Sequence, residues 1–162
     1  MFKARRKKDG TVTVRLGAAE AELLLALPAR LRAILTREDV TDRVIQRLFP
    51  PAYRDAKKES EYRGLLGREL LERKLESVDA FEKTLGNRTT QKGRVHLTIR
   101  PEEYDLWLGF INDMRLVLGT ELDIQDDNWS NNFNPSHPQA HDMAIFHYLS
   151  WLEEELLRAS GF

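Results

Sequence analysis

The stretch that decides the fold is Trp107-Leu-Gly-Phe-Ile-Asn-Asp-Met-Arg-Leu-Val-Leu-Gly-Thr120, a strongly apolar segment with an arginine inside it. Pro101 starts the helical pattern, which ends at Gly119. On a wheel of about 100° per residue, Arg115 lies about 20° from Tyr104, within the apolar arc. An arginine keeps its charge, so a buried one needs an acidic partner. The stretch therefore predicts a core helix and a second helix that supplies a carboxylate.

The C-terminal segment, about 138–159, provides that second helix. Its apolar arc includes Ile145, Tyr148 and Leu152, and Glu155 lies about 40° from the reference His141, inside the arc. We therefore predict a buried Arg115–Glu155 ion pair between two packed helices, with Glu154 as the substitute partner. A structural role is favoured; the alternative is an arginine at a dimer or ligand surface.

The N-terminal residues 1–16 predict a basic β-hairpin. Two β-prone segments, 2–6 and 11–16, flank Lys7-Lys8-Asp9-Gly10, and Asp-Gly is a strong hairpin signal. Residues 94–99 alternate apolar and polar side chains and predict a third strand in the same small antiparallel sheet.

The remaining patterns are helical. One helix is expected at 18–35, kinked or split at Pro28, a second at 41–48 with Thr41 as its cap, and a long one at 58–86, where Gly64 and Gly67 weaken the first turns. An acidic surface loop is expected at 120–137. The predicted class is α+β, mostly α-helical: one domain over 1–162, with five or six helices and the small sheet.

Composition excludes several kinds of function. The chain has 162 residues, 41% hydrophobic and 31% charged, which suits one globular domain. It contains no cysteine, so disulfides, thiol catalysis and Cys-ligated zinc are excluded. No apolar run is long enough to span a bilayer, and no apolar segment follows the basic start as in a secretory signal. We therefore expect a cytoplasmic protein without membrane contact.

Charge is unevenly distributed although the net charge is only −1. Residues 1–16 contain six Lys and Arg and one Asp, a net +5, whereas residues 119–162 contain eight acidic residues and one Arg, a net −7. The asymmetry suggests a polar partner surface or self-association, and a homodimer is expected. Five basic residues could contact phosphates, although small basic clusters usually only protect strand edges: Lys3, Arg5, Arg6, Lys7 and Lys8.

No motif for catalysis or for a cofactor is present. His137, His141 and His147 lie close in sequence, but Pro138 separates the first two, so surface and helix-end positions are expected rather than a metal site. Glycine-rich phosphate loops and nucleophile elbows are missing. The one candidate small-ligand pocket is near Trp107, Asn112 and Arg115. We predict no catalytic residue, no metal and no cofactor.

Three segments carry a resemblance to a known family: Arg47-Leu-Phe-Pro-Pro-Ala-Tyr-Arg-Asp55, Ile111-Asn-Asp-Met-Arg-Leu-Val-Leu-Gly-Thr120 and Tyr148-Leu-Ser-Trp-Leu-Glu-Glu-Glu-Leu156 in order and spacing. In these the chain resembles the actinobacterial AosR family of oxidative-stress transcriptional regulators, first catalogued as a domain of unknown function. The resemblance covers essentially the whole chain, and the Asn112–Thr120 block is its most specific part.

The resemblance implies a small non-enzymatic protein that acts by binding protein partners such as a sigma factor or the transcription machinery. Sensing of oxidants through a cysteine pair, which the resemblance would otherwise imply, does not carry over to a chain without cysteine. The expected function is therefore regulation through protein partners. Direct DNA binding by the basic hairpin and binding of a small ligand are the alternatives.

Overall fold

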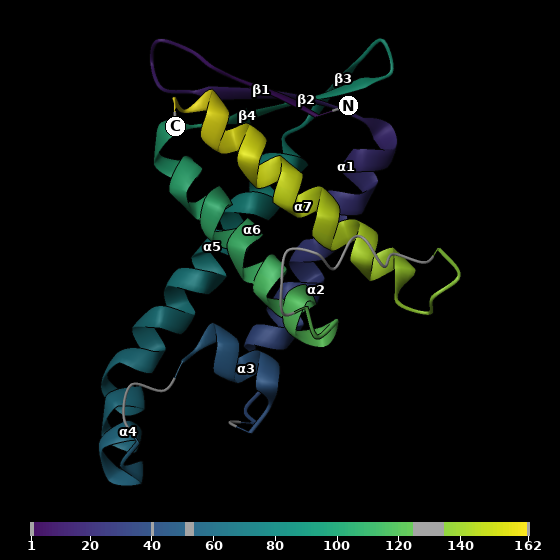
Figure 1. Cartoon of the computed structure of the whole chain (residues 1–162). Coiled ribbons are helices and arrows are strands. Elements are labelled where there is room, and N and C mark those ends of the chain that lie inside the picture. Colours follow the sequence, from purple (N-terminus) through teal and green to yellow (C-terminus); the bar gives the residue numbers. More distant parts are fainter. Residues whose placement is uncertain (1, 40, 51–53, 125–134, 162) are drawn as a thin grey trace.

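Four antiparallel strands form a sheet that covers one end of a set of packed helices (Figure 1). The arrangement comes from a computed structural model that describes residues 2–39, 41–50, 54–124 and 135–161. The strands are β1 (Lys3–Arg6), β2 (Val12–Gly17), β3 (Thr89–Gln91) and β4 (Arg94–Ile99), in the order β1-β2-β4-β3. The predicted α+β class, mostly helical with a small antiparallel sheet, is confirmed.

The predicted N-terminal hairpin is present, and its turn touches the helical layer. Lys7 N donates to Thr11 O at 2.8 Å and Gly10 N donates to Lys7 O at 3.0 Å. Gly10 has a φ of 89°, in the left-handed region that favours glycine. A Cβ on Gly10 would lie 3.2 Å from the Cγ of Pro101. The turn therefore needs glycine both for its backbone and for its approach to the next helix.

The predicted strand at 94–99 is β4, and it pairs with β2 in the middle of the sheet. The sequence did not reveal β3, which pairs with the other edge of β4. All three residues of β3 are exposed, so they show no alternation of apolar and polar side chains. Lys92 and Gly93 both have positive φ, as a tight two-residue hairpin requires.

Pro28 divides the first helical segment, as predicted. The two helices are α1 (Ala18–Leu25) and α2 (Leu27–Leu35), with Pro28 in the first turn of α2. Proline has no amide hydrogen for the carbonyl one turn earlier, but in a first turn none is needed. Leu24, Leu27 and Leu31 are fully buried, so both helices contribute to one core.

Helix α3 (Arg43–Leu48) has the expected inward side chains but a different cap. Asp42, not Thr41, accepts a hydrogen bond from Val44 N at 2.8 Å, so the prediction of Thr41 as the cap was wrong. The hydroxyl of Thr41 instead donates to Asp39 at 2.6 Å. Asp is as good a cap as Thr, and the helix simply begins later than its apolar pattern suggested.

The long helical segment starts at residue 56 and contains a wider turn. It consists of α4 (Ala56–Tyr62), a π-helical turn η1 (Arg63–Gly67) and α5 (Arg68–Gly86). The π-turn spans Gly64 and Gly67, where the sequence predicted a weak helix. No residue of α4 is buried, and α4 lies at the end of the molecule farthest from the sheet (Figure 1).

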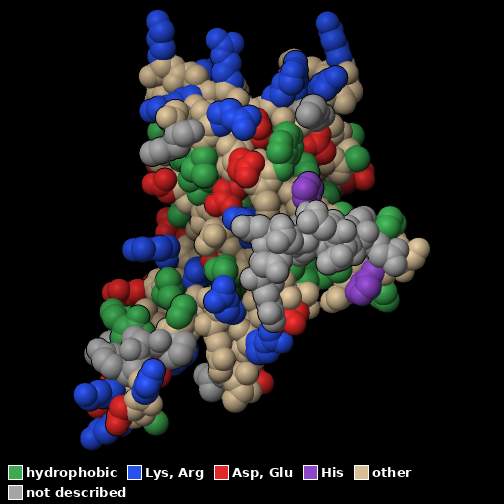
Figure 2. Space-filling view, in the orientation of Figure 1, with side chains coloured by type: hydrophobic (Ala, Val, Ile, Leu, Met, Phe, Trp, Pro, Cys, Tyr) green, Lys and Arg blue, Asp and Glu red, His purple; other side chains and the backbone are tan. Residues whose placement is uncertain are grey.

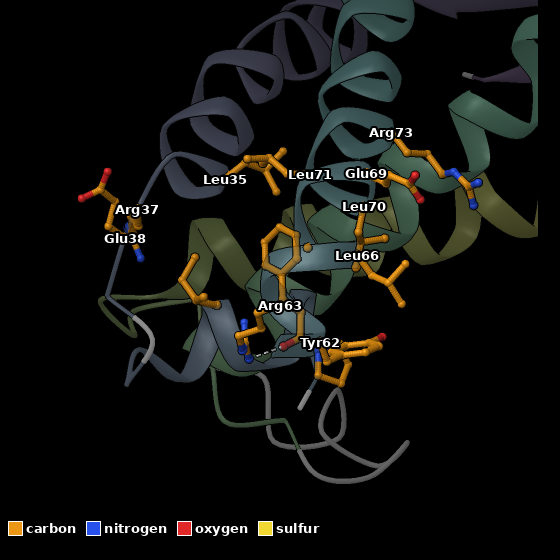
Figure 3. Close-up of a pocket in the computed structure, with 14 residues that line it drawn as sticks. Leu35, Arg37, Glu38, Tyr62, Arg63, Leu66, Glu69, Leu70, Leu71 and Arg73 are labelled. Carbon is orange, nitrogen blue, oxygen red and sulfur yellow. Dashed lines mark hydrogen bonds between the residues drawn. The ribbon is translucent and has the colours of Figure 1, made fainter. Parts of the chain in front are cut away.

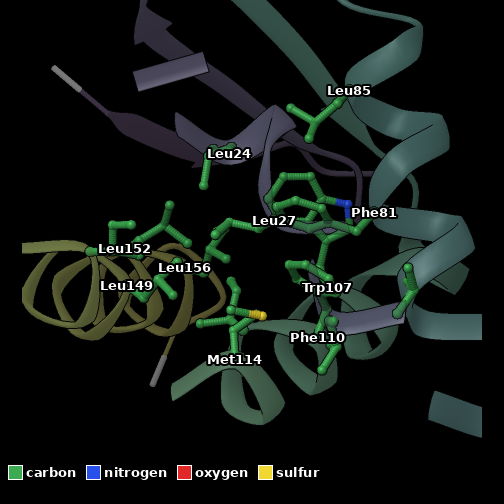
Figure 4. Close-up of a cluster of buried hydrophobic side chains, with 14 of the residues drawn as sticks. Leu24, Leu27, Phe81, Leu85, Trp107, Phe110, Met114, Leu149, Leu152 and Leu156 are labelled. Carbon is green, nitrogen blue, oxygen red and sulfur yellow. The ribbon is translucent and has the colours of Figure 1, made fainter. Parts of the chain in front are cut away.

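Helices α6 (Pro101–Glu121) and α7 (Ala140–Ala159) pack side by side beneath the sheet (Figure 1). Between them and α5 lies the aromatic centre of the core (Figure 4), where Phe81 stacks on Phe110 with ring centroids 3.9 Å apart and lies 4.3 Å from Trp107. No helix in the described part of the chain has both the length and the hydrophobicity needed to cross a membrane.

Helix α6 buries two sides rather than the single stripe that the wheel suggested. One side faces α7, where the Tyr104 hydroxyl donates to Leu156 O at 2.8 Å. The other side faces α5 and carries Phe110 and Asp113. Most of the acidic loop predicted at 120–137 lies outside the described residues, since 125–134 are not among them, while its first residues, 120 and 121, belong to α6.

Candidate functional site

The face of the sheet turned away from the helices carries basic and uncharged polar side chains. Side chains alternate between the two faces of a strand, and residues paired across strands point to the same face. Val12, Val14 and Leu16 are buried against the helices, so the residues between them face outward. The pairing register then assigns to the open face Lys3, Arg5, Thr13, Arg15, Thr89, Gln91, Arg94, His96 and Thr98.

Tertiary structure assembles this basic face from two distant parts of the chain. Lys3 pairs with Arg15, which pairs with His96, and these three side chains form one row across the sheet. Arg94 lies opposite Gly17 at the end of β2. A shallow hollow of about 570 Å³ over β1, β2 and β4 is lined by this row together with Arg5. The sequence predicted that residues 94–99 join this sheet, but it did not give the register that places Arg94 and His96 on the same face as Lys3 and Arg15.

The sheet layer has a strong excess of positive charge. Residues 3–17 and 88–100 contain ten Lys and Arg and one acidic residue, Asp9, which gives a net charge of +9. Because the whole chain has a net charge of −1, the remainder carries −10. Asp9 lies in the turn, where it accepts a hydrogen bond from Thr11 N at 2.9 Å. Figure 2 shows Lys and Arg side chains at the top of the molecule, over the sheet, and acidic ones below.

The five predicted phosphate contacts do not form one cluster. Lys3 and Arg5 belong to the open face. Arg6 points to the helical side, where its guanidinium donates to Ser160 O at 3.3 Å, just beyond the end of α7. Lys7 and Lys8 are exposed in the turn. The alternation of strand side chains separates neighbours in sequence, so a basic run becomes two surfaces.

The chemistry of the open face suits phosphate groups rather than bases. Among the described strand residues, those on this face include no acidic side chain and no Phe, Tyr or Trp, so His96 offers the one ring on which a base could stack. The guanidinium groups of Arg5, Arg15 and Arg94 can bind phosphate oxygens with paired hydrogen bonds. Threonine hydroxyls beside them add neutral donors.

The predicted pair between Arg115 and Glu155 was wrong in its partner. Arg115 binds Glu153 through its guanidinium and also donates from Nε to the hydroxyl of Ser150 at 3.1 Å. Glu155 instead accepts from Arg158 at 2.7 Å. The arginine does link α6 to α7, but its side chain remains 33% exposed. Arg115 therefore lies at the margin of the helix contact, and its partner on α7 is two residues earlier than the wheel suggested.

The buried ion pair of this fold lies on the opposite side of α6. Lys74 Nζ of α5 lies 2.8 Å from Asp113 Oδ1, and the side chains are 15% and 7% exposed. Asp113 is buried because α6 packs on α5 as well as on α7, whereas a single buried stripe on α6 would have left it facing solvent. Burial raises the pKa of Asp113, while the hydrogen bond from Lys74 works against this increase.

The predicted pocket near Trp107, Asn112 and Arg115 is not assembled as expected. Trp107 is fully buried in the aromatic core. Asn112 and Arg115 do line one hollow, of about 810 Å³, together with Arg43 and Arg47 of α3. A tryptophan five positions before Asn112 lies about 140° away around a helix, so the two cannot share a cavity.

The three C-terminal histidines are not brought to a common centre with acidic groups. Within the described residues, no group of three or more His, Asp or Glu side chains is arranged to hold a metal ion. His137 Nδ1 accepts a hydrogen bond from Gln139 N at 3.0 Å, just before α7.

A second surface feature is an apolar groove at the other end of the molecule (Figure 3). The groove has a volume of about 400 Å³ and lies between α2 and α3 on one side and η1 and α5 on the other. Arg63 helps to close its end by donating to Phe49 O at 3.0 Å. Apolar side chains form much of its lining: Leu35, Ile45, Phe49, Leu66, Leu70 and Leu71.

Comparison with known proteins identifies only a family. A family model described as "Domain of unknown function (DUF2017)" matches residues 1–160. No curated protein and no solved structure matches the chain.

Proposed function

The chain belongs to the DUF2017 family, whose function is unknown, and we propose that it is a non-enzymatic regulatory protein of the cytoplasm that binds nucleic acid through the open face of its sheet. The observation that carries this proposal is the charge of the sheet layer, with ten basic residues and one acidic residue in residues 3–17 and 88–100. The likeness to the AosR family of transcriptional regulators supports the regulatory part of the proposal.

Electrostatics supports a polyanion as the ligand. A face with several Lys and Arg side chains neutralises phosphates and releases the counterions condensed on the nucleic acid, which drives binding. The acidic remainder of the molecule, at −10, repels the same ligand. Binding is therefore directed to one end of the protein, even though its net charge is close to zero.

The side chains favour recognition of the backbone over recognition of sequence. Arginine and threonine contacts to phosphates fix position and carry little sequence information. A two-stranded or larger sheet can lie against a duplex, and the hairpins at both ends of this sheet extend the basic surface with Lys7, Lys8 and Lys92. We propose that a double-stranded backbone is preferred over single strands, because the described strand residues of this face include no Phe, Tyr or Trp for stacking and only the ring of His96.

A protein partner is the second candidate, and the apolar groove favours it. The resemblance implies a sigma factor or the transcription machinery as the partner. A groove with a leucine-rich lining and a charged rim is the type of surface that receives an amphipathic helix. The two functions use opposite ends of the molecule, so each can be tested separately.

The test of the proposed function is a titration of fluorescent duplex DNA followed by anisotropy at low and moderate salt. The variant Arg15→Ala/Arg94→Ala removes two open-face charges, and Arg43→Ala/Arg47→Ala is the matched control, because these exposed arginines lie on α3, away from the sheet (Figure 1). We expect the first variant to lose at least about tenfold in affinity and the control to bind within about twofold of wild type. No binding at low salt, or equal losses in both variants, would overturn the proposal.

A further inference from the structure

The half of α6 that lies farther from the sheet borders a polar hollow, which the proposed nucleic-acid binding does not use (Figure 1). The hollow has a volume of about 810 Å³ and is lined by α3, by α6 with the residues that follow it, and by Phe146 of α7. Pockets of about 300–1,000 Å³ are typical of small-molecule sites. We propose that this hollow binds the phosphate group of a small organic molecule, with Arg47 as the main contact and Asn112 and Arg115 beside it.

Three arginine side chains line this hollow because α3 packs against α6. Arg43 and Arg47 lie on α3, and Arg115 lies on α6. Residues four positions apart are neighbours on one side of a helix, so Arg43 and Arg47 are presented together. A guanidinium group binds phosphate or carboxylate oxygens through paired hydrogen bonds. Three such groups around one space favour an anion as the ligand.

One of the three arginines has no acidic partner. Arg43 binds Asp123 at 3.3 Å, and Arg115 binds Glu153. Arg47 is exposed and forms neither a hydrogen bond nor an ion pair within the part of the chain that the structure describes. The two carboxylates therefore neutralise two of the three guanidinium groups. One positive charge remains in the hollow for an anion to neutralise.

The hydrogen-bond donors that remain open suit a phosphate better than a carboxylate. Arg115 uses Nε for Ser150 and one terminal nitrogen for Glu153, which leaves its second terminal nitrogen for a ligand. The exposed amide of Asn112 makes no hydrogen bond with the described residues. These donors come in addition to the whole guanidinium of Arg47. A phosphate monoester can satisfy them, because it has three acceptor oxygens and a charge of about −1.5 to −2 at pH 7, whereas a carboxylate has two oxygens and one charge.

The guanidinium of Arg115 is held in place before a ligand binds. The hydroxyl of Ser150 accepts from its Nε at 3.1 Å and donates to Phe146 O at 2.9 Å. The guanidinium carbon also lies 5.7 Å from the centre of the Phe146 ring. A side chain that is already ordered loses little conformational entropy on binding, which favours affinity.

The rest of the lining indicates that the phosphate is attached to an organic group. Leu116 and Ile124 line the same hollow, so part of its wall is apolar. Small-molecule sites typically combine such walls with a few polar groups that fix the orientation of the ligand. An apolar group on the phosphate should therefore add affinity that inorganic phosphate lacks.

The first test is an NMR titration of the ¹⁵N-labelled protein with phenyl phosphate, at constant ionic strength in a buffer without phosphate. We expect wild type to bind one equivalent with a Kd of about 1 mM or lower, and Arg47→Gln to bind at least about fivefold more weakly. Arg68→Gln is the matched control and should bind within about twofold of wild type. Arg68 is also exposed and without a printed-chain partner among the described residues, but it lies on α5 and does not line the hollow. No saturable binding by wild type, or equal losses in both variants, would overturn the proposal.

The second test compares three ligands on wild type. Benzoate has the ring of phenyl phosphate with a carboxylate in place of the phosphate, and it should bind at least about fivefold more weakly. Inorganic phosphate lacks the ring and should also bind at least about threefold more weakly. Benzoate binding as tightly as phenyl phosphate would refute the phosphate as the recognised group. Equal binding of inorganic phosphate would refute the organic part of the ligand.

Two further variants separate charge from hydrogen-bond geometry. Arg47→Lys keeps the positive charge but not the paired donors, so it should recover only part of the affinity that Arg47→Gln loses. Asn112→Asp places a negative charge in the hollow and should reduce binding at least as much as Arg47→Gln. Both side chains are exposed, so circular dichroism should show unchanged helix content. Full recovery in Arg47→Lys would contradict the paired hydrogen bonds.

The site in the hollow is independent of the proposed function, because α3 and the open face of the sheet lie apart (Figure 1). Arg43→Ala/Arg47→Ala should lose phenyl phosphate binding and keep duplex DNA binding. Arg15→Ala/Arg94→Ala should show the reverse. Loss of phenyl phosphate binding in Arg15→Ala/Arg94→Ala alone would place the phosphate on the sheet and would overturn the site in the hollow, while the proposed function would stand.

Discussion

Lys74 on α5 and Asp113 on α6 form an ion pair at 2.8 Å, with side chains only 15% and 7% exposed. Lys74 also lies 5.8 Å from the centre of the Phe49 ring. The pair joins the two helices on the side of α6 that faces away from α7. Its desolvation offsets much of its attraction, so it specifies how the helices are aligned more than it stabilises them.

Removal of one partner from this pair should be much more harmful than removal of both. We expect Lys74→Met to lower the free energy of unfolding by about 3 kcal/mol at pH 7, because it leaves a buried carboxylate unpaired. Lys74→Met/Asp113→Leu should return to within about 1 kcal/mol of wild type. Urea unfolding followed by circular dichroism measures both values. A double variant as unstable as Lys74→Met would show that the fold depends on the attraction between Lys74 and Asp113, and not only on avoiding an unpaired buried charge.

The pH dependence of the Lys74→Met variant should have a defined sign. The pKa of Asp113 is already raised by burial. A carboxyl with a raised folded pKa contributes stability at low pH, which is lost as the pH rises through that pKa. Without Lys74 the pKa of Asp113 rises further. The loss in the free energy of unfolding of Lys74→Met, relative to wild type, should therefore become smaller as the pH is lowered toward 4. A deficit that is constant between pH 4 and 7 would contradict a charged Asp113 as its cause.

The observed partner of Arg115 can be separated from the predicted one by two matched substitutions. Glu153→Gln should cost about 1 kcal/mol, because Glu153 binds Arg115 between α6 and α7 with its side chain 19% exposed. Glu155→Gln should cost less than about 0.5 kcal/mol, since its partner Arg158 is 71% exposed. Thermal unfolding of the two variants in one buffer tests the difference. A larger loss of stability for Glu155→Gln than for Glu153→Gln would indicate that Glu155, as predicted from the sequence, is the partner of Arg115.

Arg30 should make the fold sensitive to acid through Asp142. Its two terminal nitrogens bind the two carboxylate oxygens of Asp142 at 3.0 and 2.9 Å, and one also lies 3.1 Å from Glu121. The hydrogen bonds from Arg30 lower the pKa of Asp142. Because the pKa of Asp142 is lower in the folded protein than in the unfolded chain, where it is about 3.9, the ionised carboxylate stabilises the fold above pH 3.9. This stabilisation is lost as the pH falls through the pKa of the folded protein. Asp142→Asn should therefore cost about 1 kcal/mol at pH 7 and nothing once Asp142 is protonated.

The control for this acid dependence is Asp79→Asn. Asp79 also binds an arginine, Arg32, at 2.9 Å, but its side chain is 72% exposed. Solvent screens such a pair, so the free energy of unfolding of the variant should match that of wild type within about 0.5 kcal/mol, both at pH 7 and at a pH at which Asp142 is protonated. Equal pH profiles for Asp79→Asn and Asp142→Asn would remove Arg30 as the cause.

Gly10 should be the glycine at which alanine is most costly. Its φ of 89° is strained for a residue with a Cβ, and that atom would lie 3.2 Å from Pro101. We expect Gly10→Ala to destabilise the protein by about 1–2 kcal/mol. Gly86→Ala, at the end of α5 with no atom within 4 Å of the new Cβ, should be neutral or stabilising by about 0.5 kcal/mol. The two melting temperatures should therefore move in opposite directions or by clearly different amounts.

The salt dependence of DNA binding should show which side chains of the open face contact phosphates. The logarithm of the affinity falls linearly with the logarithm of salt concentration, with a slope set by the number of phosphates contacted. Arg15→Ala and Arg94→Ala should each reduce that slope by about 1. Arg6→Ala should leave it unchanged, because Arg6 points to the helical side and binds Ser160 O. An equal reduction for Arg6→Ala would show that the hairpin, rather than the face, contacts the DNA.

The sequence by itself determined the elements whose signals are local. Asp9-Gly10 and two alternating segments specify the first hairpin, Pro28 divides the first helices, and Pro101 begins α6. Each of these depends on backbone geometry or on a periodic pattern within a few residues, so no distant contact is needed to read it. The exposed strand β3 has no such pattern, and its pairing with β4 is its only support.

Only the tertiary structure decided which charges meet. Glu153, Glu154 and Glu155 follow one another at about 100° per residue around α7, so the orientation of α7 against α6 decides which of them reaches Arg115. Asp113 became buried because α6 packs on two neighbours, and no single-helix pattern contains that fact. Strand pairing, likewise, joined Arg94 and His96 to Lys3 and Arg15 on one face. Local periodicity fixes where a side chain points on its own element, whereas its partner depends on how elements far apart in sequence come together.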